Sequence, residues 1–253
     1  MIFNFDFAAE SFPKILSAIP VTLLLTVIGM AVSSVLGFLM AMARIEKRKF
    51  WAGFSSVYIT IMRGVPIMVQ LYLVFVALPL AIQSIAGAAG IKTYVDIPPM
   101  VVAATALSLN YTAYMEEVFR AEIQSVDSGQ WEAAISIGMT KRQMMTEVIL
   151  PQAFVEAIPN LGNTFIGLIK DTSLAYMVMV MDIMGEARTL AGAGLNYLEA
   201  YADAALIYWG LNFLLERLFG IWERHAGVFN RKDVRQEGKT RMRTKVRTAA
   251  AGR

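Results

Sequence analysis

Two adjacent charges interrupt a long apolar stretch of this sequence. Lys170 and Asp171 lie near the middle of residues 157–181, where no other charged side chain occurs. A charge at the centre of a membrane-spanning helix costs about 2.5–3.5 kcal/mol, so such residues usually face a water-filled cavity or a partner. Asp171 has the sign that binds an ammonium group, and Lys170 has the sign that binds a carboxylate. The alternative is structural: neighbours on a helix point about 100° apart, so each charge would pair with another part of the chain.

Neutral polar groups near these charges are candidates for lining the same path. Ser173 follows them in the same stretch, and Asn110 and Tyr111 lie near the end of another apolar stretch. A tyrosine at the end of a span is also a common interfacial anchor. Both interpretations are therefore open for Tyr111 and for Tyr114.

Further charges flank the apolar stretches. Arg63 stands next to Gly64 and close to Pro66, which indicates a broken helix start, with the arginine anchored at the membrane surface. Glu117 and Arg120 are three residues apart, the spacing of an ion pair on a helix surface. We expect this pair to brace the polar segment that follows rather than to take part in catalysis.

The sequence lacks the residues that several kinds of catalytic or metal site need. There is no cysteine, and His225 is the one histidine. Disulfides, thiol catalysis and a site with two histidine ligands from this chain are therefore excluded. No GxxxxGK[ST] sequence occurs, so we expect no P-loop ATP site in this chain. We expect no cofactor and no metal site either.

A polar segment, residues 116–156, is too hydrophilic to cross a membrane and is typical of a helical hairpin. Asp127 and Gln130 have the spacing of a capping box. A first short helix is therefore expected to begin near Gln130 and to stop at Gly138, because glycine is the usual residue after a helix end.

A second helix is expected in the same hairpin. Thr140 and Gln143 repeat the capping-box spacing. The helix that follows should end at Pro151, because proline interrupts helical hydrogen bonding. The hairpin as a whole then occupies residues 125–151.

The first helix of the hairpin has features of a docking surface. The small pair Ala133 and Ala134 would let a partner approach closely. Trp131, Ile135 and Met139 follow at intervals of four and could fill a groove in that partner. The alternative is a hairpin that packs under its own helical bundle.

Composition places the chain in the membrane. Hydrophobic residues make up 57% of it, and its mean hydropathy is +0.52, whereas soluble domains hold about 45–50% apolar residues. A span takes roughly 20 mostly apolar residues. We expect an all-α integral membrane helical bundle, one domain over residues 1–229, with a basic tail over 230–253. The expected spans, about five, lie near residues 15–43, 54–83, 97–115, 157–181 and 203–222.

Positive charge alternates between the loops and sets the expected orientation. Bases concentrate between spans one and two, between spans three and four, and in the tail, whereas each of the other two loops holds one. The positive-inside rule predicts an outside N-terminus and a cytoplasmic C-terminus. Residues 1–14 hold two acids and one base, so we expect the first apolar run to remain as a span, not to be a cleaved signal peptide. Residues 231–253, with nine bases and two acids, should be disordered and rest on anionic lipid rather than bind nucleic acid.

The hairpin carries the residues of a known signature. Residues 132–151, EAAISIGMTKRQMMTEVILP, resemble the EAA loop of ABC importer permeases, which is Glu-Ala-Ala, three residues, Gly, nine residues and then Ile-x-Leu-Pro. Val148 replaces the signature isoleucine. In that family the loop forms a coupling helix that sits in a cleft of the ATPase subunit, and the resemblance implies this role here. The matching residues are Glu132, Ala133, Ala134, Gly138, Leu150 and Pro151.

Three more stretches are similar to polar amino-acid permeases and follow in that family's order. They are YITIMRGVPIMVQLY at residues 58–72, AYMEEVFR at 113–120 and KDTSL at 170–174. The resemblance covers roughly residues 15–225. It implies the type I ABC importer permease (MetI-like) fold and a place in the bacterial cytoplasmic (inner) membrane.

The resemblance implies a transport subunit, not an enzyme. Such a subunit forms the path for a polar amino acid or close analogue, which an extracytoplasmic binding protein delivers. It pairs with a second permease, identical or paralogous, and couples to a dimer of ABC ATPase subunits that hold ATP and Mg. The rival interpretation is a self-sufficient secondary transporter, which would need coupling-ion sites and usually has internal repeats. A structural membrane scaffold is a further alternative, but it would not need the EAA spacing.

Overall fold

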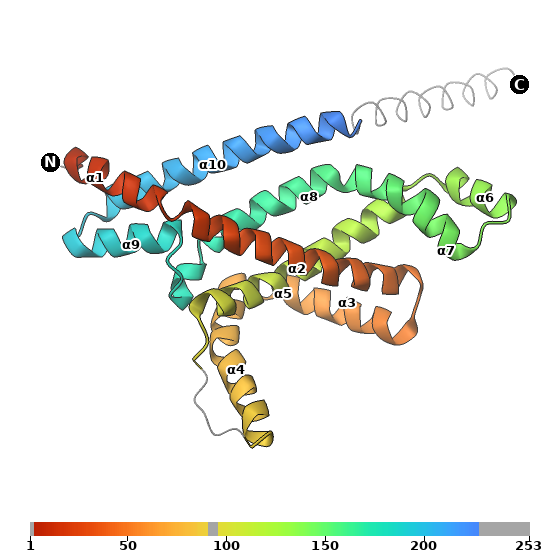
Figure 1. Cartoon of the computed structure of the whole chain (residues 1–253), viewed down its shortest axis with the longest axis horizontal. Coiled ribbons are helices and arrows are strands. Elements are labelled where there is room, and N and C mark those ends of the chain that lie inside the picture. Colours follow the sequence, from red (N-terminus) through yellow and green to blue (C-terminus); the bar gives the residue numbers. More distant parts are fainter. Residues whose placement is uncertain (1–2, 91–95, 228–253) are drawn as a thin grey trace, which may run out of the picture. The chain divides into compact units, whose positions relative to one another are not determined.

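The computed structural model describes residues 3–90 and 96–227, and over these ranges it contains helices and no strands (Figure 1). The all-α prediction is thus confirmed, while the tail over 230–253 lies outside the described residues. The long helices are α2 (Ile19–Ile45), α3 (Lys49–Gly64), α4 (Ile67–Ala88), α5 (Pro99–Ser125), α8 (Leu150–Thr172) and α10 (Tyr197–His225). The shorter elements are α1 (Phe5–Leu16), α6 (Ser128–Ser136), α7 (Lys141–Gln143), the π-helix η1 (Met144–Ile149), the 3₁₀-helix η2 (Ala175–Val178) and α9 (Ile183–Gly194).

The expected spans fall on these long helices. In the described part of the chain, three helical stretches are long and apolar enough to cross a membrane: residues 5–45, 67–88 and 197–225. The third expected span lies largely on α5, which is 27 residues long, and the fourth lies partly on α8, which is 23 residues long.

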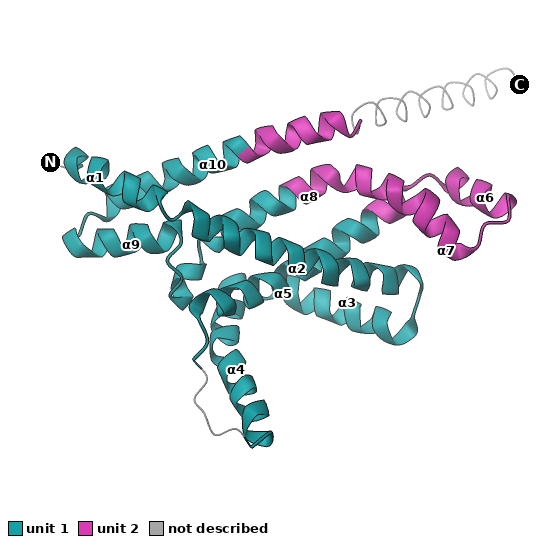
Figure 2. Cartoon of the chain, in the orientation of Figure 1, with its two compact units in different colours: residues 1–121, 163–214 teal, residues 122–162, 215–253 magenta. Residues whose placement is uncertain are grey.

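The chain divides into two compact units (Figure 2). The first consists of residues 1–121 and 163–214, and the second of residues 122–162 and 215–253. Three helices, α5, α8 and α10, each contribute residues to both units. The expected single membrane domain over residues 1–229 stays a prediction.

Close approach of α2 to α5 shapes the first unit. A buried apolar cluster takes Leu25 from α2, Leu107 from α5 and Leu168 from α8. At Gly37 of α2, an added Cβ would lie 2.7 Å from Cβ of Met115. Only a residue without a side chain fits there, so this glycine sets how closely α2 and α5 pack.

Small residues and buried acids join α1, α9 and α10 in the same unit. Fully buried alanines of α9 and α10 pack with Ile15 of α1. The Asp203 carboxylate accepts a 2.6 Å hydrogen bond from the Ser11 hydroxyl. The Glu199 carboxylate accepts one of 2.7 Å from the backbone N–H of Asn4. These contacts satisfy polar groups that would otherwise be costly to bury.

Pro66 divides the second expected span into α3 and α4. The preceding residue, Val65, is extended, as proline favours. The break leaves the carbonyls of Met62 and Val65 without helical donors, and the Gln70 side chain donates to both at 2.8 Å. Asn110 of α5 adds a 3.1 Å bond to the Met62 carbonyl. Neighbouring side chains commonly satisfy a broken membrane helix in this way.

The predicted place of Arg63 is corrected by this break. We expected a broken helix start, but Arg63 lies in the last turn of α3, which begins at Lys49. The segment continues with the 22 residues of α4. The break therefore lies within the segment, because Pro66 ends one helix after 16 residues rather than delaying its start.

The fourth expected span, residues 157–181, is not one continuous helix. Helix α8 ends at Thr172, so Lys170 and Asp171 lie in its last turn, and whether they lie at mid-membrane stays a prediction. The N–H groups of Ser173 and Leu174 bond the carbonyls of Lys170 and Asp171 in tight 3₁₀ fashion. Such i→i+3 bonds commonly close a helix end. The apolar residues that follow form η2 and a turn, which hydropathy does not distinguish from a continuing helix.

The second unit contains the predicted hairpin, with two corrections. At the first helix, the Asp127 side chain accepts a hydrogen bond from the Gly129 N–H instead of forming a capping box with Gln130. Helix α6 spans Ser128–Ser136, and the capping box of Thr140 and Gln143 is present at the start of α7. The predicted stop at Pro151 is wrong, because the π-helix η1 leads directly into α8. Pro151 therefore lies inside a continuous helical segment, directly after the π-helical turn of η1.

Candidate functional site

A cation and a carboxylate lie at the two ends of a pair of aromatic rings in the first unit. The Tyr111 hydroxyl donates to Oδ2 of Asp171 at 2.7 Å. The rings of Tyr111 and Tyr114 have centroids 5.4 Å apart. The Arg63 guanidinium lies 5.5 Å from the centroid of the Tyr114 ring, within the range of a cation–π contact. We call these four residues, from α3, α5 and α8, the tyrosine bridge.

Exposure shows which members of the tyrosine bridge a ligand could reach. Arg63 and Tyr114 are exposed, Asp171 is half-buried and Tyr111 is buried. No cation pairs with Asp171 among the described residues. The tyrosine bridge therefore offers an exposed cation, an aromatic surface and a half-buried carboxylate as separate contacts for a ligand.

The other candidates for the substrate path are Lys170, Ser173 and Asn110, and they differ in exposure and in bonding. Lys170 is exposed and has no carboxylate partner in the described part of the chain, and Ser173 is half-buried. Asn110 is 3% exposed and is used at the α3–α4 break, where it also donates to Gln70 Oε1 at 3.2 Å. Asn110 is thus bonded to the α3–α4 break, and its place along a path stays a prediction.

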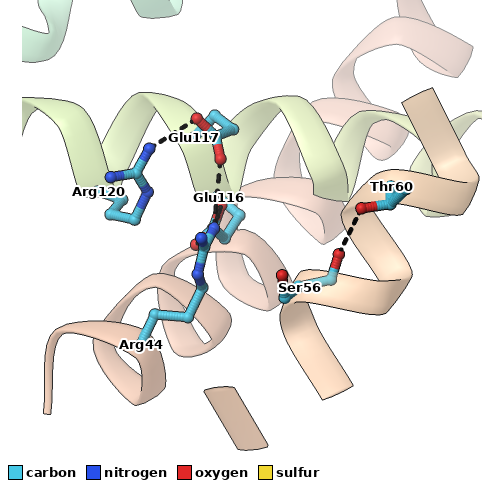
Figure 3. A network of polar contacts seen from close by, with 6 residues as sticks. All are labelled: Arg44, Ser56, Thr60, Glu116, Glu117 and Arg120. Carbon is cyan, nitrogen blue, oxygen red and sulfur yellow. Dashed lines mark hydrogen bonds and ion pairs between the residues drawn. The ribbon is translucent and has the colours of Figure 1, made fainter. Parts of the chain in front are cut away.

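A network of four charges ties the end of α2 to α5 (Figure 3). Arg44 Nη1 lies 3.0 Å from Glu116 Oε1 and 3.2 Å from Glu117 Oε1. Glu117 also accepts a 2.8 Å bond from Arg120, so the predicted pair is present. Glu116 is fully buried, which makes Arg44 its necessary counter-charge. Sequence reasoning did not predict this contact. It treated Arg44 only as a positive charge in a loop and Glu116 only as the first residue of the polar segment.

The charges in this network also fix the state of Glu117, which follows the third expected span. Burial by itself raises the pKa of Glu117, but hydrogen bonds and positive charge from Arg120 and then Arg44 lower it below its ordinary value. Glu117 therefore stays ionised and keeps both arginines in place.

The end of α6 is a well-formed turn at the predicted glycine. Gly138 has φ +79, the left-handed conformation that glycine adopts easily. Its N–H bonds the Ile135 carbonyl at 3.0 Å, and the Met139 N–H bonds the Ala134 carbonyl at 3.1 Å. These are the two bonds of a Schellman motif, which fixes the direction of the chain after a helix.

Large apolar side chains are exposed around this turn. Ile135 is 64% exposed and Ile137 is 75% exposed. Glu132 and Ala133 are exposed as well, whereas Ala134 is buried. Sequence reasoning found Ile135 but missed Ile137, which is off the interval-of-four pattern because it lies at the helix end.

The remaining hairpin candidates contribute to packing within the second unit. Trp131, Met139 and Leu150 are half-buried, and Pro151 is exposed. The Glu156 carboxylate accepts a 2.8 Å bond from Ser125, which ties the end of α5 to α8. The hairpin is thus anchored at its base, while its turn exposes apolar side chains.

The chain is similar to known membrane transport proteins. Residues 33–227 match the family described as binding-protein-dependent transport system inner membrane component. The L-cystine transport system permease protein TcyB of Bacillus subtilis is 40% identical over 225 residues, covering 87% of this chain and 89% of that protein.

Two solved structures resemble the fold. A crystal structure of an amino acid ABC transporter with histidines matches with a TM-score of 0.77 and 31% identity, over 89% of this chain and 100% of that chain. An inward-facing MetNI methionine ABC transporter matches with a TM-score of 0.63 and 17% identity, over 88% and 97%. The second likeness concerns the fold alone.

Proposed function

The chain belongs to the family of binding-protein-dependent transport system inner membrane components, and we propose that its tyrosine bridge forms the amino-acid path of an ABC importer. The protein is a permease subunit of this kind of transporter and a multi-pass protein of the inner membrane. Permeases of this family are transport components, so no reaction is assigned to the chain itself.

The observation that carries the proposal is the arrangement of Arg63, Tyr114, Tyr111 and Asp171. The carboxylate of Asp171 would hold the ammonium group of an amino acid, and Arg63, on the far side of the two rings, would bind a carboxylate at another point of the path. Lys170 and Ser173, next to Asp171, would contact polar parts of the side chain. The named relatives, one for L-cystine and one solved with histidines, support an amino acid or close analogue as the cargo.

Coupling to ATP hydrolysis would pass through the hairpin. We propose that Ile135 and Ile137, both exposed beside the Schellman turn, enter an apolar cleft of a separate ATPase subunit. Exposed apolar side chains at a rigid turn are typical of a docking surface. ATP and Mg would bind to that partner, and the described residues contain no cluster able to hold a metal ion.

The remaining partners follow from the family. The importer would contain a dimer of ATPase subunits, a second permease that is identical or paralogous, and an extracytoplasmic amino-acid-binding protein. The N-terminus would lie outside and the C-terminus in the cytoplasm. This orientation places the hairpin over residues 125–151 on the side where ATP is available.

Uptake into proteoliposomes tests the proposal. The permease would be reconstituted with its co-purifying ATPase and binding protein, and uptake of radiolabelled amino acids measured with ATP inside or outside. We expect uptake that requires ATP and the binding protein. Uptake by the permease alone, driven by an ion gradient, would instead support the rival secondary transporter.

A further inference from the structure

A polar cavity lies within the first unit, away from the contacts of the tyrosine bridge. Its volume is about 300 Å³, and its walls come from α4, η2 and α9. Tyr72, Tyr176 and Arg188 provide its aromatic and charged lining. This volume is at the lower end of the range for small-molecule sites, which suits a ligand of amino-acid size.

Arg188 is a cation without a counter-charge in this cavity. Its guanidinium lies 4.9 Å from the centroid of the Tyr176 ring. Among the residues that the structure describes, no carboxylate pairs with Arg188. In the described part of the chain, the guanidinium N–H donors of Arg188 also have no hydrogen-bond partner. Those donors have the fork geometry that binds a carboxylate through two parallel hydrogen bonds.

The wall that carries Arg188 is held in place by the backbone. A Cβ added at Gly185 would lie 2.4 Å from the carbonyl oxygen of Val180, so only glycine allows this approach. The Gly185 N–H also donates to Oδ1 of the buried Asp182 at 2.9 Å. Met179, at φ +70, turns the chain between η2 and this wall. The cavity is therefore formed before a ligand arrives, which lowers the entropic cost of binding.

Two tyrosines supply further donors and an apolar surface. In the described part of the chain, the hydroxyls of Tyr72 and Tyr176 have no hydrogen-bond partner in the protein. Both can bind polar atoms of a ligand, while their rings cover its carbon chain. A carboxylate on Arg188 would thus be accompanied by neutral polar and aromatic contacts.

We propose that this cavity binds an amino acid by its α-carboxylate, with Arg188 as the binding residue, at a point separate from the tyrosine bridge. Helix η2 begins four residues after Asp171, so the two places are linked by a short segment of chain. Arg188 lies between the fourth and fifth expected spans, in a loop expected to face outside. The inference rests on the proposed function: the cavity would receive an amino acid before it reaches Asp171.

Modification of arginine by phenylglyoxal tests the site directly. The permease complex, purified with its own ATPase, would be treated with the reagent, and the adduct at Arg188 quantified by mass spectrometry. An equimolar mixture of the twenty amino acids should slow modification at least about fivefold. A mixture of their methyl esters, which lack the carboxylate, should not. The rate at Arg188 would be taken relative to that at Arg48, which is exposed outside both the cavity and the hairpin, because free arginine in the mixture also consumes the reagent.

Three results would overturn the inference. They are equal modification of Arg188 with and without amino acids, equal protection by acids and esters, and protection by ligand-free binding protein alone, which would assign Arg188 to protein docking. Uptake distinguishes this failure from failure of the proposed function. An unprotected Arg188 with normal ATP-driven uptake rejects the cavity alone, whereas absence of ATP-driven uptake rejects both.

A pair of variants supplies the second readout. Arg188→Gln should raise the apparent KM for uptake about tenfold with little change in maximal rate, and Arg188→Lys should restore part of the loss. Equal KM values in wild type, Arg188→Gln and Arg188→Lys would contradict a carboxylate contact. Membrane yield should be normal in both variants, because Arg188 is exposed.

Discussion

At the scale of single residues, the partner of Asp171 bears on both interpretations of the charges in α8. One alternative is that these charges bond other spans, and Asp171 does accept a 2.7 Å hydrogen bond from Tyr111 of α5, while Lys170 is exposed. Because the hydroxyl of Tyr111 is neutral, the Asp171 carboxylate still has no counter-charge among the described residues. A half-buried carboxylate without a protein cation is available to a cationic ligand.

Neutralising Asp171 should weaken substrate binding while the protein still folds. A charge-assisted hydrogen bond contributes about 1.5–3 kcal/mol and a neutral one about 1 kcal/mol, so Asp171→Asn should lower the apparent affinity on the order of tenfold. The measurement is substrate-stimulated ATPase activity of the permease complex, together with membrane yield, in Asp171→Asn, Lys170→Gln and the double variant.

Tyr111→Phe is the matched control for this change. It removes the hydrogen bond but keeps the carboxylate charge, so the apparent affinity should fall by less than about threefold. If the pair were structural, yield would fall first in Asp171→Asn, and the double variant would recover part of it. Normal yield and normal stimulation in Asp171→Asn would contradict both interpretations.

Side-chain interactions could be predicted between residues that are close in sequence, but not between residues that are distant in sequence. Glu117 and Arg120 are one helical turn apart, so their ion pair followed from spacing. Arg44 meets Glu116 across 72 positions of sequence. No local pattern marks such a contact, although a glutamate directly after an apolar run is a signal that a counter-charge must exist.

At the scale of elements, capping residues predicted the helices of the hairpin, whereas hydropathy could not locate helix ends inside apolar stretches. The capping box at Thr140 involves residues only three positions apart, so it could be predicted from the sequence. The break at Pro66 was recognised but was taken as a helix start, because part of its stabilisation comes from Asn110 of α5, 48 positions from Met62. At Pro151 the proline rule failed, because a π-helix shifted where the next helix begins.

The turn after α6 should tolerate only residues that adopt a left-handed backbone. An added Cβ at Gly138 would meet no atom within 4 Å, so strain at φ +79 is the obstacle rather than space. A left-handed conformation costs an ordinary residue about 1–2 kcal/mol. Gly138→Leu should therefore reach the membrane at normal yield but lose uptake and ATPase co-purification.

Gly138→Asn is the control for this prediction, because asparagine enters the left-handed region more easily. Its uptake should stay close to that of the wild type. Unchanged uptake in Gly138→Leu would show that the turn is not at a tight junction with a partner.

At the scale of the whole molecule, the membrane bundle and its family were predictable from composition and motifs, while its orientation stays a prediction. The chain has no cysteine, so single introduced cysteines report topology without background. Tags at Ser84 and Asn196 should react with an impermeant reagent from outside, and tags at Lys47 and Lys141 should not. Labelling of Lys141→Cys from outside would reject both the orientation and the role of the hairpin.

Co-purification of the ATPase tests the central claim, that the hairpin of this permease couples the amino-acid path to a separate motor. Tagged wild type, the double variant Ile135→Glu with Ile137→Glu, and the control Leu195→Glu would be purified from native membranes. All three positions are exposed and apolar, with Leu195 81% exposed in the loop after α9. Exposed surface changes usually alter stability by only about 0.5 kcal/mol.

The account predicts that the wild type and Leu195→Glu retain equal amounts of an ABC ATPase. The double hairpin variant should reach the membrane at the same level and retain at least about tenfold less ATPase, because two carboxylates would be driven into an apolar cleft. Equal ATPase recovery with the double hairpin variant and the wild type would contradict the account.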